Sequence, residues 1–236
     1  ILSGLVGSEM CIRDRISHMR TCISSTKALS MSGLLSVTVT TGPSYSTLMY
    51  LVGAYGIGKS MYATRGMPTI SPTVLFLCTG NATRSVLAGT VLEQLRPDIT
   101  VTTAGTFALA DRPMSWRTKA AFDEIEIPHP VHRSKQAQWQ HLEDASLVIG
   151  LSPEHVEWVR REHPRHASRA ATLIHIVASL PAGNEPLRDR VAQLGLDGHL
   201  LSPSEDVMDP GGHEIEAFVE CARNVRDLVN RLAPLI

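Results

Sequence analysis

The segment from Val74 to Ser85 constrains the fold more than any other part of the chain. An apolar run, Val74-Leu75-Phe76-Leu77, is followed by Cys78 and a small turn, after which Arg84 and Ser85 open a helical pattern. A strand that feeds a helix N-terminus through such a loop forms an anion cradle, because the loop N–H groups and the helix dipole converge there. The N–H groups expected to line the cradle are those of Thr79, Gly80, Asn81, Ala82 and Thr83.

Cys78 lies at the base of the expected cradle. A helix N-terminus and a nearby cation lower a cysteine pKa from about 8.5 to roughly 3.5–7.5, so this thiol is expected to ionise readily. Arg84 follows on the same loop and is expected to bind two phosphate oxygens with its planar guanidinium. A lone cysteine here would be interpreted as a buried structural residue. The combined Cys, Gly-Asn turn, Arg and Ser instead indicate an activated nucleophile.

The string Cys78-Thr-Gly-Asn-Ala-Thr-Arg84-Ser85 resembles the active-site signature of the low-molecular-weight protein tyrosine phosphatases, a family that includes related arsenate reductases. The resemblance extends over nearly all of residues 73–233. It includes Thr-Ala-Gly-Thr after the second expected strand, His-Arg-Ser before the third helix and Asp-Pro ahead of the last helix. It implies a four-stranded parallel sheet and a reaction that requires no metal and no other cofactor.

Strand and helix patterns alternate after residue 73, which indicates an α/β fold, a three-layer sandwich with helices on both faces of a parallel sheet. Strands are expected at residues 74–77, 99–103, 145–151 and 172–177. Helices are expected at residues 85–95, 115–125, 135–142, 152–162 and 214–232, with a polar connection over 181–204. Ligands of such a sheet bind beyond the carboxyl ends of its strands, where Cys78 lies.

Asp209-Pro210 resembles the Asp-Pro of the family, whose Asp is the general acid. A departing alkoxide or phenoxide needs a proton, and an Asp on a loop over the cradle can donate it. Taken alone, Asp before Pro is a turn signal, and Glu205 and Asp206 are rival acids. The resulting hypothesis is a two-step displacement. Cys78 forms a phosphocysteine, and water activated by the same Asp then hydrolyses it.

The expected catalytic residues are Cys78, Arg84 and Asp209. The residues expected to bind the phosphate are Thr79, Gly80, Asn81, Ala82, Thr83, Arg84 and Ser85. Ser85 is also expected to hydrogen-bond the thiolate. The resemblance further implies that Asn81, Thr103 and His132 brace the loop by hydrogen bonds, and a buried structural role is the alternative for each.

Three departures from the family pattern limit the functional hypothesis. Thr83 stands where many members carry a second cysteine, so the protective disulfide is missing. Gly211-Gly212 stands where tyrosine-selective members place aromatic residues, which puts phosphotyrosine selectivity in doubt. Only Cys221 lies downstream, which disfavours a thioredoxin-coupled arsenate relay. Arsenate reduction with an external thiol and a non-catalytic phosphate-binding module remain the alternatives to a phosphatase.

The composition indicates which binding partners and which cellular compartment to expect for this protein. A net charge of −1 gives no sign of a nucleic-acid or membrane-surface partner, and the four scattered cysteines form no disulfide framework. We expect a cytoplasmic monomer that acts on a phosphorylated protein or a small phosphomonoester. The histidines of Glu162-His163-Pro-Arg-His166 are interpreted as surface residues rather than metal ligands, because Pro164 breaks the helix that would align them.

The catalytic domain is expected to span residues 67–236, and residues 1–66 are expected to be a disordered or artefactual extension. The string S-E-M-C-I-R-D-R within residues 1–15 resembles translated sequencing-adapter DNA. Residues 16–70 are rich in Ser and Thr and contain no Asp or Glu, which fits upstream DNA read in frame better than a transit peptide. Residues 53–60 match the Walker A pattern, but Gly66 and Pro68 leave no room for the helix that this motif requires.

Overall fold

The computed structural model describes residues 10–12, 21–24, 38–40, 52–53, 56–57 and 71–236. The chain divides into two units, Ile1–Thr69 and Ile70–Ile236. In the first unit, β1 (Met10–Ile12), β2 (Thr21–Ser24) and β3 (Thr38–Thr40) form an antiparallel sheet, and β4 (Val52–Gly53) pairs with β5 (Gly56–Ile57). Most of the adapter-like string and of the Walker A match lies outside the described residues, so the expectations for residues 1–66 stay predictions.

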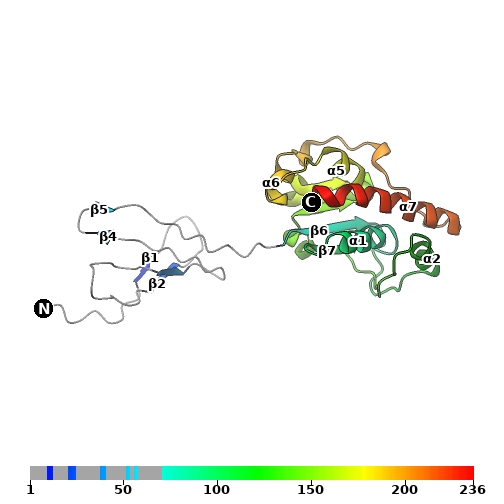
Figure 1. The fold of residues 1–236 in the computed structure, drawn as a ribbon, viewed down its shortest axis with the longest axis horizontal. Helices are drawn as coiled ribbons and strands as arrows, with labels where there is room; N and C mark the ends of the chain where they lie inside the picture. The colour runs from blue at the N-terminus through cyan, green and yellow to red at the C-terminus, as the bar shows by residue number, and fades with distance from the viewer. Residues whose placement is uncertain (1–9, 13–20, 25–37, 41–51, 54–55, 58–70) are drawn as a thin grey trace. The chain divides into compact units, whose positions relative to one another are not determined.

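The second unit is built on a parallel sheet of four strands. These are β6 (Thr73–Cys78), β7 (Thr100–Gly105), β8 (Leu147–Gly150) and β9 (Ala170–Thr172), in the spatial order β7-β6-β8-β9 (Figure 1). The predicted four-stranded parallel sheet is therefore confirmed. Its central strand β6 carries Cys78 at its carboxyl end.

Alternate residues of β6 face opposite layers of the sandwich. Val74 and Phe76 join the cluster formed by α1 (Arg84–Leu95), α2 (Trp116–Glu124), α5 (Leu173–Ser179), α6 (Leu187–Ala192) and α7 (Ile215–Leu232). Leu75 and Leu77 face α3 (Trp139–Asp144) and α4 (Pro153–Glu162). All four side chains are fully buried, and burial stabilises the fold by about 1.5–3 kcal/mol for each large apolar side chain. The core thus fixes the strand that presents the cysteine.

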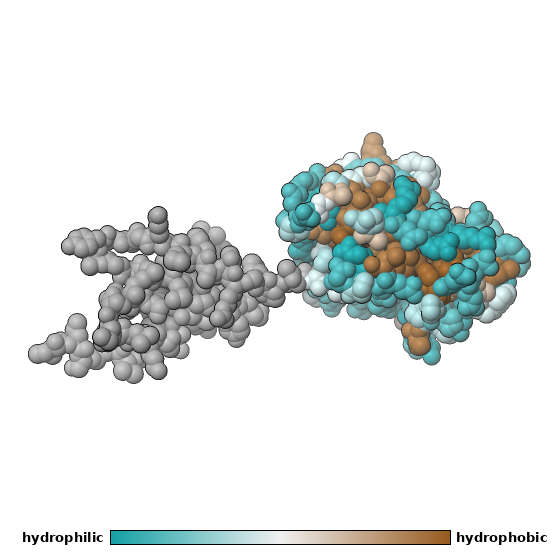
Figure 2. Space-filling model, in the orientation of Figure 1, coloured by the Kyte–Doolittle hydropathy of each residue, from teal (hydrophilic) through white to brown (hydrophobic). Residues whose placement is uncertain are grey.

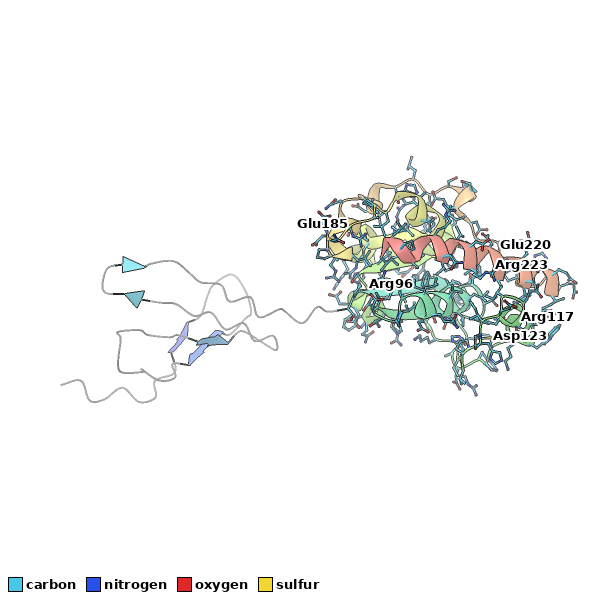
Figure 3. The ribbon with its side chains drawn as sticks, in the orientation of Figure 1. Arg96, Arg117, Asp123, Glu185, Glu220 and Arg223 are labelled. Atoms are coloured by element: carbon cyan, nitrogen blue, oxygen red, sulfur yellow. The ribbon has the colours of Figure 1, made fainter. Side chains whose placement is uncertain are left out.

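The longest helix, α7, packs along α1 on one face of the sheet (Figure 1). Charged side chains of this layer, including Arg117, Asp123, Glu220 and Arg223, are drawn on its outer side (Figure 3). Arg223 forms an ion pair with Glu124, which links α7 to α2. Hydrophilic residues cover much of the visible surface, with apolar patches between them (Figure 2). No helix among the described residues has the length and apolar character needed to cross a bilayer.

The helices α2 and α4, which follow β7 and β8, begin at the capping residues that the sequence predicts. The Ser115 hydroxyl accepts a hydrogen bond from the Thr118 N–H at the start of α2. Ser152 caps α4, with Pro153 in the first turn and His155 completing a capping box. Such caps stabilise a helix by about 1 kcal/mol each.

The expected strand at residues 172–177 is wrong. The strand β9 ends at Thr172, and the chain continues directly into α5. The Thr172 hydroxyl accepts from the His175 N–H, which caps the helix, and the buried residues Leu173, Ile176 and Val177 follow helical spacing. A short apolar, β-branched run does not distinguish a buried strand from a buried helix by itself.

The expected helix at residues 135–142 begins later than predicted, at Trp139. Lys135 and Ala137 instead hydrogen-bond through their backbones to Gly105 at the end of β7, so this stretch is extended. The expected polar connection over 181–204 is likewise not free of helix. It contains α6, the 3₁₀ turn η2 (Leu196–Gly198) and the start of η3 (Pro203–Glu205). Further 3₁₀ turns are η1 (Pro164–Arg169) and η4 (Ala233–Leu235).

We predict that Gly105→Ala destabilises the domain, because Gly105 is the point where β7 meets the loop after β6. A Cβ at this position would lie 2.5 Å from the backbone oxygen of Thr79 and 3.0 Å from the backbone nitrogen of Asn81. Overpacking against backbone costs about 1–3 kcal/mol. Urea unfolding should show a loss in this range.

Gly198→Ala is the matched control, since a Cβ there meets no atom within 4 Å. Its free energy of unfolding should stay within about 0.5 kcal/mol of the parent protein. Equal unfolding midpoints for the Gly105 and Gly198 variants would contradict the predicted close approach.

Candidate active site

The cysteine and the serine of the signature meet at the junction of β6 and α1. Cys78 ends β6 and is 3% exposed, and Ser85 lies in the first turn of α1. The Cys78 Sγ and Ser85 Oγ atoms are 3.0 Å apart, within hydrogen-bond distance. The helix has no side-chain cap at Thr83 and no acidic residue in its first turn. No carboxylate in this turn therefore neutralises the positive end of the helix dipole, which favours binding of an anion in the loop.

Asn81 holds the loop in shape from inside. Its backbone is left-handed, with φ at 49°, and its side chain is fully buried. The Asn81 Nδ2 group donates to Ser85 Oγ at 3.1 Å and to Thr103 Oγ1 at 3.0 Å. Its Oδ1 atom accepts from the Lys135 N–H at 3.0 Å. Asparagine tolerates this conformation better than most residues, and here every donor and acceptor bond ties the loop to a neighbouring element.

His132 completes the support of the loop. Its Nε2 atom lies 2.7 Å from the Asn81 carbonyl oxygen, and because a carbonyl only accepts, Nε2 carries the hydrogen. Burial lowers the pKa of His132, although this hydrogen bond opposes the shift. The imidazole is therefore neutral near pH 7. Asn81, Thr103 and His132, which the sequence analysis grouped together, thus converge on one loop.

Arg84 connects the loop to the segment that carries the expected acid. Its guanidinium is 3% exposed. One nitrogen, Nη2, donates to Asp209 Oδ2 at 2.6 Å, and the other, Nη1, donates to the Val207 carbonyl oxygen at 3.1 Å. The Asp206 Oδ1 atom lies farther away, 3.9 Å from Nη1. A buried cation needs such partners, because desolvation of an unpaired charge is costly.

The three candidate acids occupy different positions. Asp209 is 54% exposed, and its Oδ1 atom accepts from the Gly211 N–H at 3.0 Å. Burial raises the pKa of Asp206, with Arg84 opposing the shift and Glu154 and Asp209 adding to it. Glu205 instead hydrogen-bonds Thr172 and His199, which both lie outside the loop. The geometry therefore leaves Asp209 and Asp206 beside Arg84 and moves Glu205 to another cluster.

His155 is a neighbour of the loop that the sequence analysis missed. It lies in the first turn of α4, and its Nε2 atom is 3.1 Å from Thr79 Oγ1. The Ser152 N–H donates to its Nδ1 atom at 3.0 Å, so Nε2 carries the hydrogen. Burial, with the Arg84 charge, lowers the pKa of His155 to about 3. The sequence feature that could have indicated His155 is its position just after β8, because the carboxyl ends of β8 and β6 lie side by side.

Thr83, which stands where many family members carry a second cysteine, contacts hydroxyl groups of the next helix instead. Thr83 Oγ1 lies 2.8 Å from Thr118 Oγ1, which in turn lies 3.0 Å from Ser115 Oγ at the start of α2. Cys221 is a second free cysteine of the domain of residues 71–236, and it is buried in α7. Burial raises the pKa of the Cys221 thiol to about 12. Cys221 is therefore protonated at neutral pH and poorly suited to attack a disulfide.

Comparison with known sequences identifies the same region. Residues 73–189 match the family model described as low molecular weight phosphotyrosine protein phosphatase. A protein-arginine-phosphatase of Geobacillus stearothermophilus is 29% identical over 161 residues, covering 68% of this chain and 93% of the relative. The low molecular weight protein-tyrosine-phosphatase PtpB of Staphylococcus epidermidis is 22% identical, covering 67% of this chain and 95% of the relative.

Solved structures agree with the observed fold. The YwlE arginine phosphatase from Geobacillus stearothermophilus is 28% identical, with a TM-score of 0.55, and the match covers 69% of this chain and 90% of that structure. The low molecular weight protein tyrosine phosphatase from T. tengcongensis is 25% identical, with the same TM-score, and the match covers 69% and 97%. In sequence over residues 73–189 and in fold over residues 71–236, the chain therefore matches the low molecular weight phosphotyrosine protein phosphatase family.

Proposed function

We propose that this chain is a phosphatase that removes phosphoryl groups from proteins through a phosphocysteine on Cys78. The observation that supports this most is the convergence of three groups on one loop. The Cys78 sulfur lies 3.0 Å from Ser85 Oγ, and the guanidinium of Arg84 binds Asp209 at 2.6 Å. A nucleophile, a cation and an acid must share one phosphoryl group for this chemistry.

In the first step, the Cys78 thiolate attacks phosphorus and forms an S–P bond. The bond from phosphorus to the leaving atom breaks, and its electron pair goes to that atom, which takes a proton from Asp209. Arg84 and the backbone N–H groups of residues 79–83 hold the phosphoryl oxygens. Ser85 donates its hydroxyl hydrogen to the sulfur and stabilises it as the anion.

In the second step, water hydrolyses the phosphocysteine. Asp209, now a carboxylate, takes a proton from the water. The water oxygen attacks phosphorus, and the S–P bond breaks to return the thiolate. The hydroxyl of Ser85 assists this departure. The bonds from Asn81 to Thr103 and Lys135 keep the loop in its binding shape through both steps, so little reorganisation is needed during reaction.

The protein side chain that carries the phosphoryl group is phosphotyrosine in our main proposal and phosphoarginine in the second. The second is favoured by the relative from Geobacillus stearothermophilus, which is named a protein-arginine-phosphatase. Gly211-Gly212, which offers no aromatic flank to a phenyl ring, agrees with it. Phe107 is 77% exposed, and its N–H donates to the Thr79 carbonyl oxygen. This backbone bond ties Phe107 to the loop, and an aromatic ring there could contact either side chain.

Replacement of the nucleophile gives the first test. Cys78→Ser should lower kcat for p-nitrophenyl phosphate by about 10³-fold or more, because a serine hydroxyl is not ionised at neutral pH. Steady-state hydrolysis by the full chain measures this. Cys221→Ala is the matched control, since the Cys221 thiol is buried and protonated, and its kcat should stay within a few-fold of the parent value.

Two other outcomes of this experiment have clear meanings. Turnover by Cys78→Ser at a rate similar to the parent would exclude the phosphocysteine route. If neither protein turns over substrate while both bind inorganic phosphate equally in a calorimetric titration, the domain is a phosphate-binding module without catalysis.

Substitution of the two carboxylates identifies the acid. Asp209→Asn should lower kcat for phenyl phosphate by roughly 10²–10⁴-fold, the usual contribution of a general acid. The loss should be smaller with p-nitrophenyl phosphate, because p-nitrophenolate departs with less need of a proton. Asp206→Asn should lower both rates to the same modest extent. A leaving-group dependence that follows Asp206 instead would assign the acid to Asp206.

Matched peptides distinguish the two substrate proposals. One peptide sequence carrying either phosphotyrosine or phosphoarginine is incubated with the full chain, and released phosphate is measured. Our main proposal expects a kcat/KM at least about tenfold higher for the phosphotyrosine form, a difference of about 1.4 kcal/mol in transition-state binding. A preference of that size for phosphoarginine would replace the main proposal with the second.

A further inference from the structure

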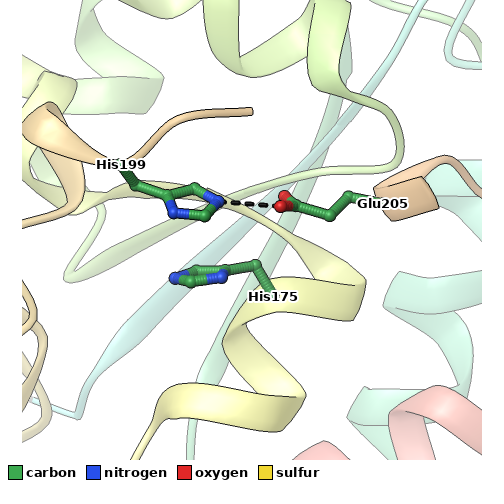
Figure 4. Close-up of side chains that lie close together, drawn as sticks. All are labelled: His175, His199 and Glu205. Carbon is green, nitrogen blue, oxygen red and sulfur yellow. Dashed lines mark hydrogen bonds and ion pairs between the residues drawn. The ribbon is translucent and has the colours of Figure 1, made fainter. Parts of the chain in front are cut away.

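Two histidines and a glutamate form a cluster separate from the expected catalytic set. They are His175 on α5, His199 just after η2 and Glu205 at the end of η3 (Figure 4). One ligand atom from each residue lies within 4.8 Å of the other two. Among the described residues, these three form the group of possible metal ligands whose donor atoms lie this close together.

Three elements hold the side chains of this cluster together. The imidazole rings of His175 and His199 stack with centroids 3.7 Å apart and planes inclined by 23°. The His199 Nε2 atom lies 2.8 Å from Glu205 Oε1. The other carboxylate oxygen, Oε2, accepts from the Thr172 hydroxyl at 2.6 Å. Figure 4 shows both rings beside the carboxylate, with His199 bonded to it.

The charges of the cluster favour a cation. Glu205 is 8% exposed, so the cluster contains a buried carboxylate, and a bound cation would offset its charge. The ring of His175 makes no hydrogen bond to another described residue, so its lone pair has no assigned partner.

We propose that His175, His199 and Glu205 bind a divalent transition metal, with Zn²⁺ as the best match. Two imidazoles and one carboxylate are a common zinc ligand set, and water fills the fourth position. Zn–N distances of about 2.0–2.1 Å require donor atoms roughly 3.3 Å apart in a tetrahedral site. The side chains must therefore close inward from their separation of up to 4.8 Å, and the stacked rings must rotate apart. On metal binding, His199 gives up the Nε2 hydrogen that it donates to Glu205, binds through Nε2 and carries its hydrogen on Nδ1.

Thr172 supports the site from behind. Its hydroxyl donates to the Glu205 oxygen that does not face His199, which orients the carboxylate, and it also caps the helix that carries His175. Hydrogen bonds of this kind fix metal ligands in place. A carboxylate oriented by a hydroxyl beside two imidazoles is therefore a partly formed metal site rather than a chance contact.

The position of the metal has a consequence for the proposed phosphatase. Glu205 directly precedes Asp206, and Arg84 binds the segment that follows through Val207 and Asp209. A metal on Glu205 fastens the start of this segment to α5 and to His199. This consequence rests on the proposed function. Metal binding itself does not, and it is measured independently of turnover.

Sequence spacing did not indicate this site, because the ligands come from three elements. The metal hypothesis considered from the sequence concerned His163 and His166 instead. There the His166 ring lies 2.6 Å from an Arg169 nitrogen and 3.6 Å from a Glu143 oxygen, next to positive charge. The present proposal revises the expectation of no metal at one place only.

Metal binding to the full chain in a Cys78→Ser background tests the proposal, because this background removes the expected thiolate as a competing ligand. Co²⁺ should give the visible absorption of a four-coordinate site with nitrogen and oxygen ligands. Zn²⁺ should displace it. In the same background, His175→Gln and Glu205→Gln should each weaken Zn²⁺ binding by about tenfold or more.

His129→Gln is the matched control, since His129 is exposed on a loop, and its Zn²⁺ affinity should equal that of the parent. Urea midpoints measured with chelator verify that each variant folds. If Glu205→Gln does not fold, His175→Gln still decides, because its ring makes no hydrogen bond to another described residue. Equal Zn²⁺ affinity in parent and His175→Gln, or no four-coordinate Co²⁺ spectrum in the parent, overturns the proposal. Neither result affects the predicted loss of turnover in Cys78→Ser.

Discussion

A single buried cation organises this end of the domain. The guanidinium of Arg84 is almost fully withdrawn from water, so its charge must be balanced by neighbouring oxygens. Asp209 and the Val207 carbonyl provide that balance from a segment more than a hundred residues away. The same charge helps to keep His155 neutral. The position of the segment that carries Asp209 and the protonation state of His155 therefore both depend on this side chain.

The local parts of this arrangement could be predicted from the sequence. The strand, the loop and the start of α1 are contiguous, and the caps at Ser115 and Ser152 follow from hydroxyl side chains before helical patterns. The parallel sheet follows from the alternation of elements. These features depend on neighbours in the chain, which is the information that periodicity and capping rules use.

Three differences from the sequence prediction have a different physical origin. Lys135 and Ala137 are extended because Gly105 pairs with them, and no local pattern reveals that partner. His155 was missed because its relation to Thr79 arises from the adjacency of β6 and β8. The cluster of His175, His199 and Glu205 likewise needs three elements to meet. Tertiary contacts decided each case, and a single sequence does not contain them in readable form.

The glycine pair after Asp209-Pro210 has a structural reason that bears on the proposed substrate recognition. Gly212 has φ at 83°, a conformation that side chains rarely adopt, and a Cβ at Gly211 would lie 3.2 Å from Asp209 Oδ1. The turn that presents Asp209 therefore disfavours aromatic residues at these two positions. Recognition of the substrate side chain must come from elsewhere around the loop. Phe107, exposed and joined through its backbone to Thr79, is an aromatic candidate for this role. On the function proposed above, a single aromatic face would suit a planar guanidinium as well as a phenyl ring.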